Sequence, residues 1–166
     1  MKKNSKILIL VTGGTFDKEY NEITGKLFFS NSHIKEMLDL GRCKINVEIK
    51  NLMLKDSLDI EKKDRELILK ACLETNEKKL VITHGTDTMT ETAKLLADNI
   101  KDKIIVFTGA MIPYKFGASD GLFNLGSALT AVQTLKNGTY ITINGNIFKW
   151  DEVQKNREKG VFELTN

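Results

Sequence analysis

The sequence is short of the residues that mark several classes of protein. It has two cysteines, Cys43 and Cys72, and two histidines, His33 and His84, in 166 residues. The cysteines form no C-x-x-C motif, and neither histidine has a partner at the spacing of metal ligands. We therefore expect two reduced, buried thiols, no metal and a reducing compartment such as the cytoplasm.

Long apolar runs and linkers are also lacking. The first apolar run, residues 7–11, is followed by Gly13-Gly14 and is shorter than the core of a signal peptide. No run approaches the roughly 18 residues of a membrane span. The single proline, Pro113, and the lack of repeats or Pro/Gly/Ser-rich stretches favour one domain over residues 1–166, with no membrane partner.

Charge of one sign is not concentrated either. Lys and Arg number 25 against 22 Asp and Glu, which gives a formal net charge of +3. The lysines are spread over the whole chain, whereas a nucleic-acid site needs them clustered with aromatic residues. A solvated surface explains this charge, and we expect no nucleic-acid partner.

What the sequence does have is an alternation of two periodicities. Short apolar runs typical of buried strands alternate with segments whose apolar residues recur at helical spacing. Strands are predicted at 6–12, 44–52, 79–83, 103–109 and 139–145, a hairpin within 21–29, and helices at 31–41, 59–76, 88–99 and 119–135. This order predicts a three-layer α/β fold of the Rossmann or flavodoxin kind, with a mostly parallel sheet, helices on both faces and an N-terminal β-hairpin.

Polar loops follow four of these strands, at residues 13–15, 56–57, 84–88 and 109–110. Ligands of parallel sheets bind at the carboxyl ends of the strands, so these loops should converge on one edge. Each loop also has a structural explanation. Thr88 and Glu91 fit a capping box, DSLD (56–59) and GASDG (117–121) fit helix caps, and TGGT (12–15) fits a tight strand exit without a phosphate fingerprint. Thr86 and Asp87 lie before the cap and are left unexplained by it.

Four stretches together resemble one family, the bacterial-type L-asparaginases. They are TGGT (12–15), VITHGTDTMTETA (81–93), TGAMIPYKFGASDGLFNL (108–125) and a late lysine in EVQKN. The resemblance extends over nearly the whole chain and is to the larger, N-terminal domain of that family. It implies an amidohydrolase that needs no cofactor.

The resemblance also implies roles for single residues. Thr15 matches the threonine that attacks the side-chain amide, and Thr86 matches a second threonine that forms a triad with Asp87 and Lys155. Without the resemblance, Lys155 would be assigned to a solvated charged segment, residues 151–160. The residues implied to bind the substrate are Ser57 (α-carboxylate), Asp87 (α-ammonium), Ala110 (its carbonyl, to the amide nitrogen) and Gly85. His84 is expected to be structural.

The chain departs from the family pattern in three places. The family's mobile-loop tyrosine is matched by Tyr20, which is closer to Thr15 than usual, while Phe28 has the better spacing but no hydroxyl. Leu58 stands where many relatives have a polar residue. The sequence stops at Asn166, where the family's linker to a C-terminal domain would begin. We expect a short form without that domain, whose uncovered apolar surface favours a homodimer.

Two functions follow as hypotheses. The first is hydrolysis of L-asparagine to L-aspartate and ammonia through a threonyl acyl-enzyme, with weaker activity on glutamine. The second is an amino-acid-binding module of the same fold with little or no turnover. A nucleotide-binding domain is a poorer third, because it would rest on the fold alone.

Overall fold

The centre of the molecule is a six-stranded sheet in the order β4-β1-β5-β6-β7-β8. The computed structural model describes residues 5–165. The strands are β1 (Ile7–Gly13), β4 (Val47–Lys55), β5 (Lys79–Thr83), β6 (Ile104–Thr108), β7 (Gly138–Ile143) and β8 (Asn146–Lys149). The first five are parallel and β8 is antiparallel, so the predicted α/β fold is confirmed.

The apolar runs of the central strands serve two cores at once. Alternate side chains of β1 point to opposite faces, because side chains of a strand alternate. Leu8 and Leu10 join one buried cluster, and Ile7 and Ile9 join the other. All seven residues of β1 are buried, which explains why its sequence is a continuous apolar run.

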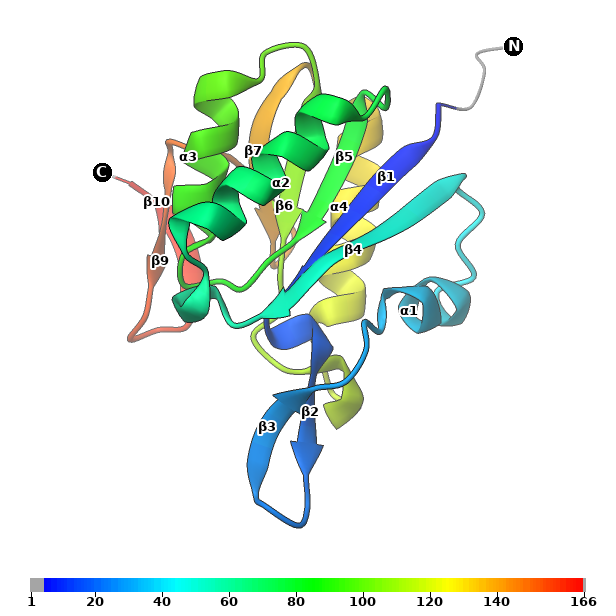
Figure 1. Cartoon of the computed structure of the whole chain (residues 1–166), viewed down its shortest axis with the longest axis vertical. Coiled ribbons are helices and arrows are strands. Elements are labelled where there is room, and N and C mark those ends of the chain that lie inside the picture. The colour runs from blue at the N-terminus through cyan, green and yellow to red at the C-terminus, as the bar shows by residue number, and fades with distance from the viewer. Residues whose placement is uncertain (1–4, 166) are drawn as a thin grey trace.

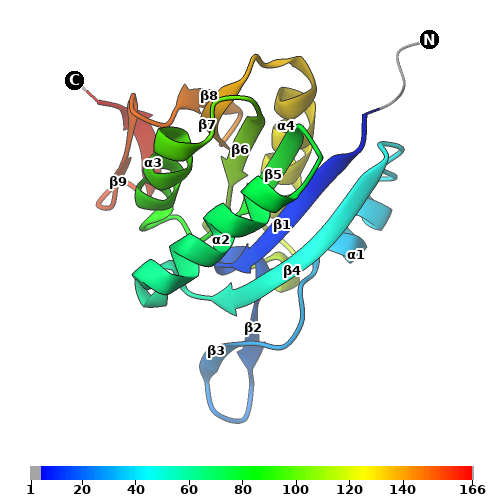
Figure 2. The ribbon, with the colours of Figure 1, turned by 45° about the horizontal axis from the view of Figure 1, so that its top comes forward.

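Helices cover both faces of the sheet, as Figure 1 shows. The helices α2 (Lys62–Glu74) and α3 (Met89–Asn99) lie on one face, and α1 (Ile34–Leu40) and α4 (Gly121–Thr134) lie on the other. The same layers are visible in the second view (Figure 2). No helix among residues 5–165 is long and apolar enough to cross a membrane.

The strand order fixes where a ligand can bind. From β1 the chain moves outward to β4 and then returns past β1 to β5, so the winding direction reverses between β1 and β5. Loops on either side of such a reversal point leave a crevice at the carboxyl ends of the strands. The loops after β1, β4 and β5 therefore border one space.

Two hairpins extend from this core. The first pairs β2 (Lys18–Asn21) with β3 (Lys26–Phe29) and projects away from the sheet (Figure 1). The prediction placed this hairpin within 21–29, but its first strand begins three residues earlier. The second pairs β9 (Val153–Asn156) with β10 (Val161–Leu164) beside α3, and its Val153 and Phe162 join the core cluster of α2 and α3.

The prediction that 139–145 is the last strand was wrong, since β8, β9 and β10 follow it. A two-residue turn, Asn144-Gly145, joins β7 to β8, and both residues have positive φ (51° and 80°). Asn-Gly between apolar runs is a strong hairpin signal that the prediction did not use. The strand predicted at 44–52 is displaced by three residues, because β4 begins at Val47 and ends at Lys55.

Candidate active site

The loops after the central strands surround a small polar cavity of about 100 Å³. Loops from β1, β4, β5 and β6 contribute to it, which agrees with the predicted convergence on one sheet edge. The lining residues are Gly14, Thr15, Lys18, Asp56, Ser57, Gly85, Thr86, Asp87, Met111 and Lys155. The cavity thus brings together six predicted site residues. Five come from the loops of the main sheet (Thr15, Ser57, Gly85, Thr86 and Asp87), and Lys155 comes from the second hairpin.

Glycines allow the three central loops to approach this closely. A Cβ on Gly14 would collide with the backbone of Gly85, and Gly14 has a φ of 77° that disfavours other residues. A Cβ on Gly85 would lie 2.6 Å from the Cβ of Ser57. The TGGT and HGTD motifs therefore need glycine where the loops bearing Thr15, Ser57 and Thr86 press together.

The contact between Thr86, Asp87 and Lys155 is the main chemical feature of the cavity. The Nζ of Lys155 lies 2.7 Å from the Oγ1 of Thr86 and 2.8 Å from the Oδ1 of Asp87. The Lys155 side chain is 13% exposed and that of Asp87 is 28% exposed. Most of residues 151–160 are exposed, as a solvated segment would be, but Lys155 is an exception because the β9–β10 hairpin turns its side chain into the cavity.

Ser57 connects two of the loops. It is 2% exposed, and its hydroxyl accepts the backbone N–H of Asp87 at 3.2 Å. Its carbonyl accepts the hydroxyl of Thr88 at 2.8 Å. The predicted capping box at Thr88 and Glu91 is therefore wrong: the Thr88 side chain makes no cap hydrogen bond to α3 and binds a neighbouring loop instead.

The two aspartates predicted as caps also bind other groups, whereas Ser119, the alternative cap in GASDG, accepts the N–H of Gly121 at the start of α4 at 2.9 Å. Asp56 accepts the N–H of Leu58 and so caps the short 3₁₀ turn Ser57–Asp59 rather than α2. Asp120 precedes α4, but its carboxylate accepts the backbone N–H groups of Met111 and Ile112 at 3.0–3.1 Å. This fixes the loop that contains buried Ala110 and brings Met111 to the cavity.

Lys18 and Asp56 also line the cavity, and their pairing was not predicted from the sequence. They form an ion pair across the space between the first hairpin and the loop after β4. Partial burial by itself raises the pKa of the Asp56 carboxyl, but the hydrogen bonds from Lys18 and Leu58 outweigh it and hold the pKa below its usual range. The sequence feature that could have pointed to Lys18 is its position three residues after Thr15.

Tyr20 is not brought to the cavity. It lies on β2, 55% exposed, and its hydroxyl is 3.9 Å from where a Cβ of Gly25 would be, at the tip of the same hairpin. It is absent from the cavity lining. Phe28, the other candidate, pairs with Glu19 in the hairpin and also lies outside the lining.

His84 is fully buried and held at both ring nitrogens. Nδ1 lies 2.8 Å from the carbonyl oxygen of Gly85, and Nε2 lies 2.9 Å from the hydroxyl of Thr92. Burial lowers the pKa of this imidazole to about 4. A neutral ring that donates from Nδ1 and accepts at Nε2 satisfies both contacts, which fits the structural role expected for it.

The thiols are both free, but only Cys72 is fully buried, and burial raises its pKa to about 12. Cys43 is half-buried, so the expectation of two buried thiols was wrong for it. Among residues 5–165, no three His, Cys, Asp or Glu side chains are grouped so that they could hold a metal ion.

Comparison with known proteins identifies the family. The family model described as asparaginase, N-terminal, matches residues 6–164. The chain belongs to the asparaginase family. An L-asparaginase of Thermococcus kodakarensis is 31% identical over 161 residues, which cover 94% of this chain and 49% of that protein. The solved structure of the thermostable L-asparaginase from the same organism matches with a TM-score of 0.84 at 29% identity, covering 97% of this chain and 51% of the other.

Not every relative is named an asparaginase. One subunit of the glutamyl-tRNA(Gln) amidotransferase of Methanococcus vannielii is 31% identical over 166 residues, covering 93% of this chain and 37% of that protein. The chain thus spans half or less of the length of these curated relatives. Membership of the asparaginase family supports an amidohydrolase and leaves the substrate open.

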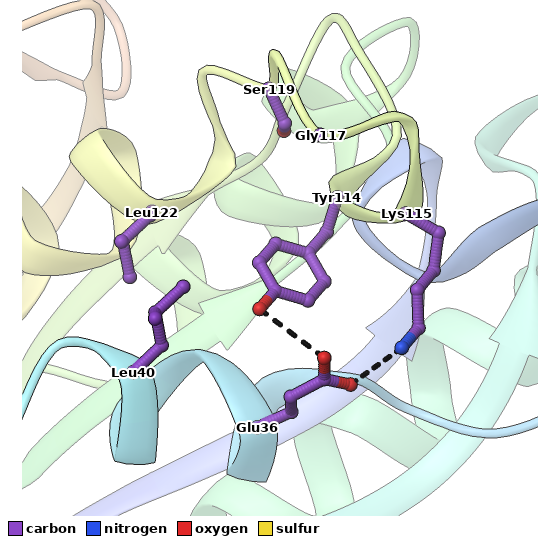
Figure 3. Close-up of a pocket in the computed structure, with 7 residues that line it drawn as sticks. All are labelled: Glu36, Leu40, Tyr114, Lys115, Gly117, Ser119 and Leu122. Carbon is purple, nitrogen blue, oxygen red and sulfur yellow. Dashed lines mark hydrogen bonds and ion pairs between the residues drawn. The ribbon is translucent and has the colours of Figure 1, made fainter.

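A roomier hollow lies away from this cavity, between α1 and the start of α4 (Figure 3). Its volume is about 340 Å³, but its polar groups bind one another: Glu36 accepts from Lys115 at 2.7 Å and from the Tyr114 hydroxyl at 3.4 Å. Volume alone does not mark a site, and none of the predicted site residues lines this hollow. We therefore assign the site to the smaller cavity.

Proposed function

We propose that this protein hydrolyses the side-chain amide of L-asparagine to give L-aspartate and ammonia. The observation that carries the proposal is the contact of Lys155 with both Thr86 and Asp87 in a polar cavity. A hydroxyl is a weak nucleophile at its ordinary pKa and needs a base beside it. A lysine oriented by a carboxylate can fill that role once it has lost its proton.

The substrate is a zwitterion, and the cavity has a partner for each of its charged groups. We assign the Asp87 carboxylate to the α-ammonium and the Ser57 hydroxyl to the α-carboxylate. The Ala110 carbonyl, in the loop held by Asp120, is assigned to the amide nitrogen. Gly85 admits the ligand close to the backbone between these groups.

The reaction proceeds through a threonyl ester. The Thr15 hydroxyl oxygen attacks the amide carbon and loses its proton, and the amide nitrogen takes up a proton and leaves as ammonia. Water then cleaves the ester, which releases aspartate and restores the Thr15 hydroxyl. The Thr86–Lys155–Asp87 triad transfers the protons. The backbone N–H of Thr86, near the start of α3, stabilises the tetrahedral oxyanion, and one such donor contributes about 3 kcal/mol.

Tyr20 is proposed as a catalytic residue that reaches the cavity when the β2–β3 hairpin bends toward it. Tyr20→Phe removes only the hydroxyl, so turnover of L-asparagine should fall while the hairpin keeps its aromatic ring. Unchanged turnover in this variant removes Tyr20 from the proposed mechanism.

Glutamine should be a poorer substrate. Its extra methylene displaces the scissile carbonyl from a nucleophile whose position is fixed by the β1 loop. We expect slower ammonia release from L-glutamine than from L-asparagine at equal concentrations.

The proposal is tested by ammonia release from L-asparagine in Thr15→Ala and Thr86→Ala. Both variants should lose activity, because each removes one of the two threonine hydroxyls that line the cavity. Undiminished release in either variant would overturn the role assigned to that threonine. Thr130→Ala, on the outer side of α4, provides a control that should keep full activity.

A second candidate is an amino-acid-binding module without turnover. It is favoured by the position of Tyr20, which is 55% exposed and lies outside the cavity lining, so one residue assigned to turnover is not in place. Calorimetry distinguishes the two functions: binding of L-asparagine or L-aspartate by a chain that releases no ammonia would favour the module.

We further propose that the protein is a homodimer in the cytoplasm. The free thiols of Cys43 and Cys72 fit a reducing compartment. Helix α4 contains no charged residue and leaves Phe123 62% exposed, which fits self-association. Light scattering at micromolar concentration should detect a dimer, and a monomer alone would contradict it.

A further inference from the structure

We propose that Lys18 binds the α-carboxylate of the substrate together with Ser57. The identity of the substrate rests on the proposed function, but the cation itself is a feature of this cavity. Lys18 belongs to none of the motifs that relate the chain to its family, so neither the motifs nor the sequence analysis assigned it a role. Its place in the fold and its contacts carry the inference.

The local backbone brings Lys18 to the side of Thr15. A 3₁₀ turn covers Thr15–Asp17, and the backbone N–H of Lys18 donates to the carbonyl of Thr15. A 3₁₀ helix has three residues per turn, so the side chains of residues three apart lie on the same side of it. Both side chains accordingly line the same cavity.

The ammonium of Lys18 is held in the cavity that Ser57 also lines. It pairs with the carboxylate of Asp56, the residue before Ser57, and its side chain is only 18% exposed. Asp56 is fixed in turn by the N–H of Leu58 at 3.0 Å. An ammonium has three donors, and Asp56 occupies one, so further donors are available to a ligand in the cavity.

The hydroxyl of Ser57 is oriented for the same task. It accepts the N–H of Asp87, which leaves its own proton free to be donated. A carboxylate between Ser57 and Lys18 would receive one neutral and one charge-assisted hydrogen bond. The second lysine of the cavity is placed differently, because Lys155 contacts the hydroxyl of Thr86 and the carboxylate of Asp87.

The four charges of the cavity then separate into two roles. Lys155 and Asp87 stand at Thr86, where Asp87 receives the ammonium of the ligand. Lys18 and Asp56 stand at Ser57, where Lys18 receives the carboxylate. Such an arrangement selects α-amino acids over amides that lack the α-carboxylate, because those amides cannot accept the hydrogen bonds that Lys18 and Ser57 donate.

Lys18→Met is the informative variant, since it removes the charge and keeps most of the aliphatic chain. We expect kcat/KM for L-asparagine to fall roughly ten- to hundredfold, the range for a hydrogen bond to a charged group, mainly through KM. β-Alaninamide is L-asparagine without its α-carboxylate. Lys18→Met should lower kcat/KM for this amide by no more than about twofold, because the amide has no carboxylate for Lys18 to bind. Lys18→Arg should recover part of the loss. Lys26→Met, an exposed lysine of the same hairpin, should match the wild type.

Two results would overturn the inference. An equal loss for L-asparagine and β-alaninamide would mean that Lys18 only positions the loops through Asp56. An unchanged kcat/KM for L-asparagine in Lys18→Met would mean that the cation does not contact the substrate.

Binding without turnover separates this inference from the proposed function. Calorimetry of L-aspartate should give roughly ten- to hundredfold weaker binding in Lys18→Met than in the wild type. β-Alanine, which lacks the α-carboxylate, should bind both proteins equally. If no ammonia is released but L-aspartate binding depends on Lys18, the hydrolase proposal fails and this inference stands. If L-aspartate binding is absent or the same in both proteins, the inference fails.

Discussion

The Nζ of Lys155 lies 2.7 Å from the Oγ1 of Thr86, although 69 positions separate the two residues in the chain. The lysine comes from a hairpin outside the main sheet, and the threonine follows a central strand. Val153 and Phe162 anchor that hairpin in the core beside α3. Packing of an apolar pair thus determines where the lysine ammonium stands.

The close approach of the loops predicts a large effect of a single methyl group. Gly85→Ala places a Cβ 2.6 Å from the Cβ of Ser57, so one loop must move. We expect a loss of roughly 1–3 kcal/mol in the free energy of unfolding, together with loss of ammonia release. Denaturant unfolding and the ammonia assay measure the two effects.

A matched control exists in α4. A Cβ on Gly126 meets nothing within 4 Å, and Gly126 is within a helix. Gly126→Ala should therefore keep activity and gain up to about 1 kcal/mol in stability. If Gly85→Ala behaves like Gly126→Ala, the loops do not need glycine at their contact.

His84 predicts how stability depends on pH. Its pKa is lowered to about 4 in the folded protein, against about 6.5 in the unfolded chain. The unfolded chain therefore takes up this proton first, so the stability from neutral His84 is complete above pH 6.5 and is lost as pH falls toward 4.

The measurement is denaturant unfolding of the wild type and of His84→Asn at about pH 6.5 and about pH 5, which lie between the two pKa values. Asparagine can still donate to the Gly85 carbonyl but does not titrate. The wild type should lose roughly 1.5 kcal/mol more than the variant over this interval. Equal losses in both proteins would show that His84 does not carry this dependence.

A threonyl ester predicts that a second nucleophile can intercept it. Hydroxylamine added to the reaction with L-asparagine should give aspartyl hydroxamate at the expense of aspartate, while ammonia release continues. Mass spectrometry of the products measures this partition. Aspartate as the sole product over a wide range of hydroxylamine concentration would favour direct attack by water.

The sheet and its edge were predictable because their signals are local. The continuous apolar run of β1 is buried on both faces, and the loop motifs follow directly from strand ends. Parallel strands bring such loops to one edge without any knowledge of side-chain packing. Thr15, Ser57 and Thr86 could therefore be placed together from their positions in the sequence.

Contacts that depend on packing were harder to predict. The Thr88 hydroxyl binds the Ser57 carbonyl rather than its own helix, so a tertiary contact overrode the local capping pattern. The β9–β10 hairpin has the charged sequence of an exposed segment, and Val153 and Phe162 fix it to the core. The Lys18–Asp56 pair joins residues 38 apart with no shared motif.

The central claim is that Lys155 activates the threonine pair, and ammonia release from L-asparagine by Lys155→Met tests it most directly. Lys159→Met removes an exposed lysine of the same hairpin and is the control. We predict that Lys155→Met lowers kcat at least about 100-fold, the loss expected for a general base, while Lys159→Met matches the wild type. Equal kcat values in Lys155→Met and the wild type, or no ammonia from the wild type, would contradict the account.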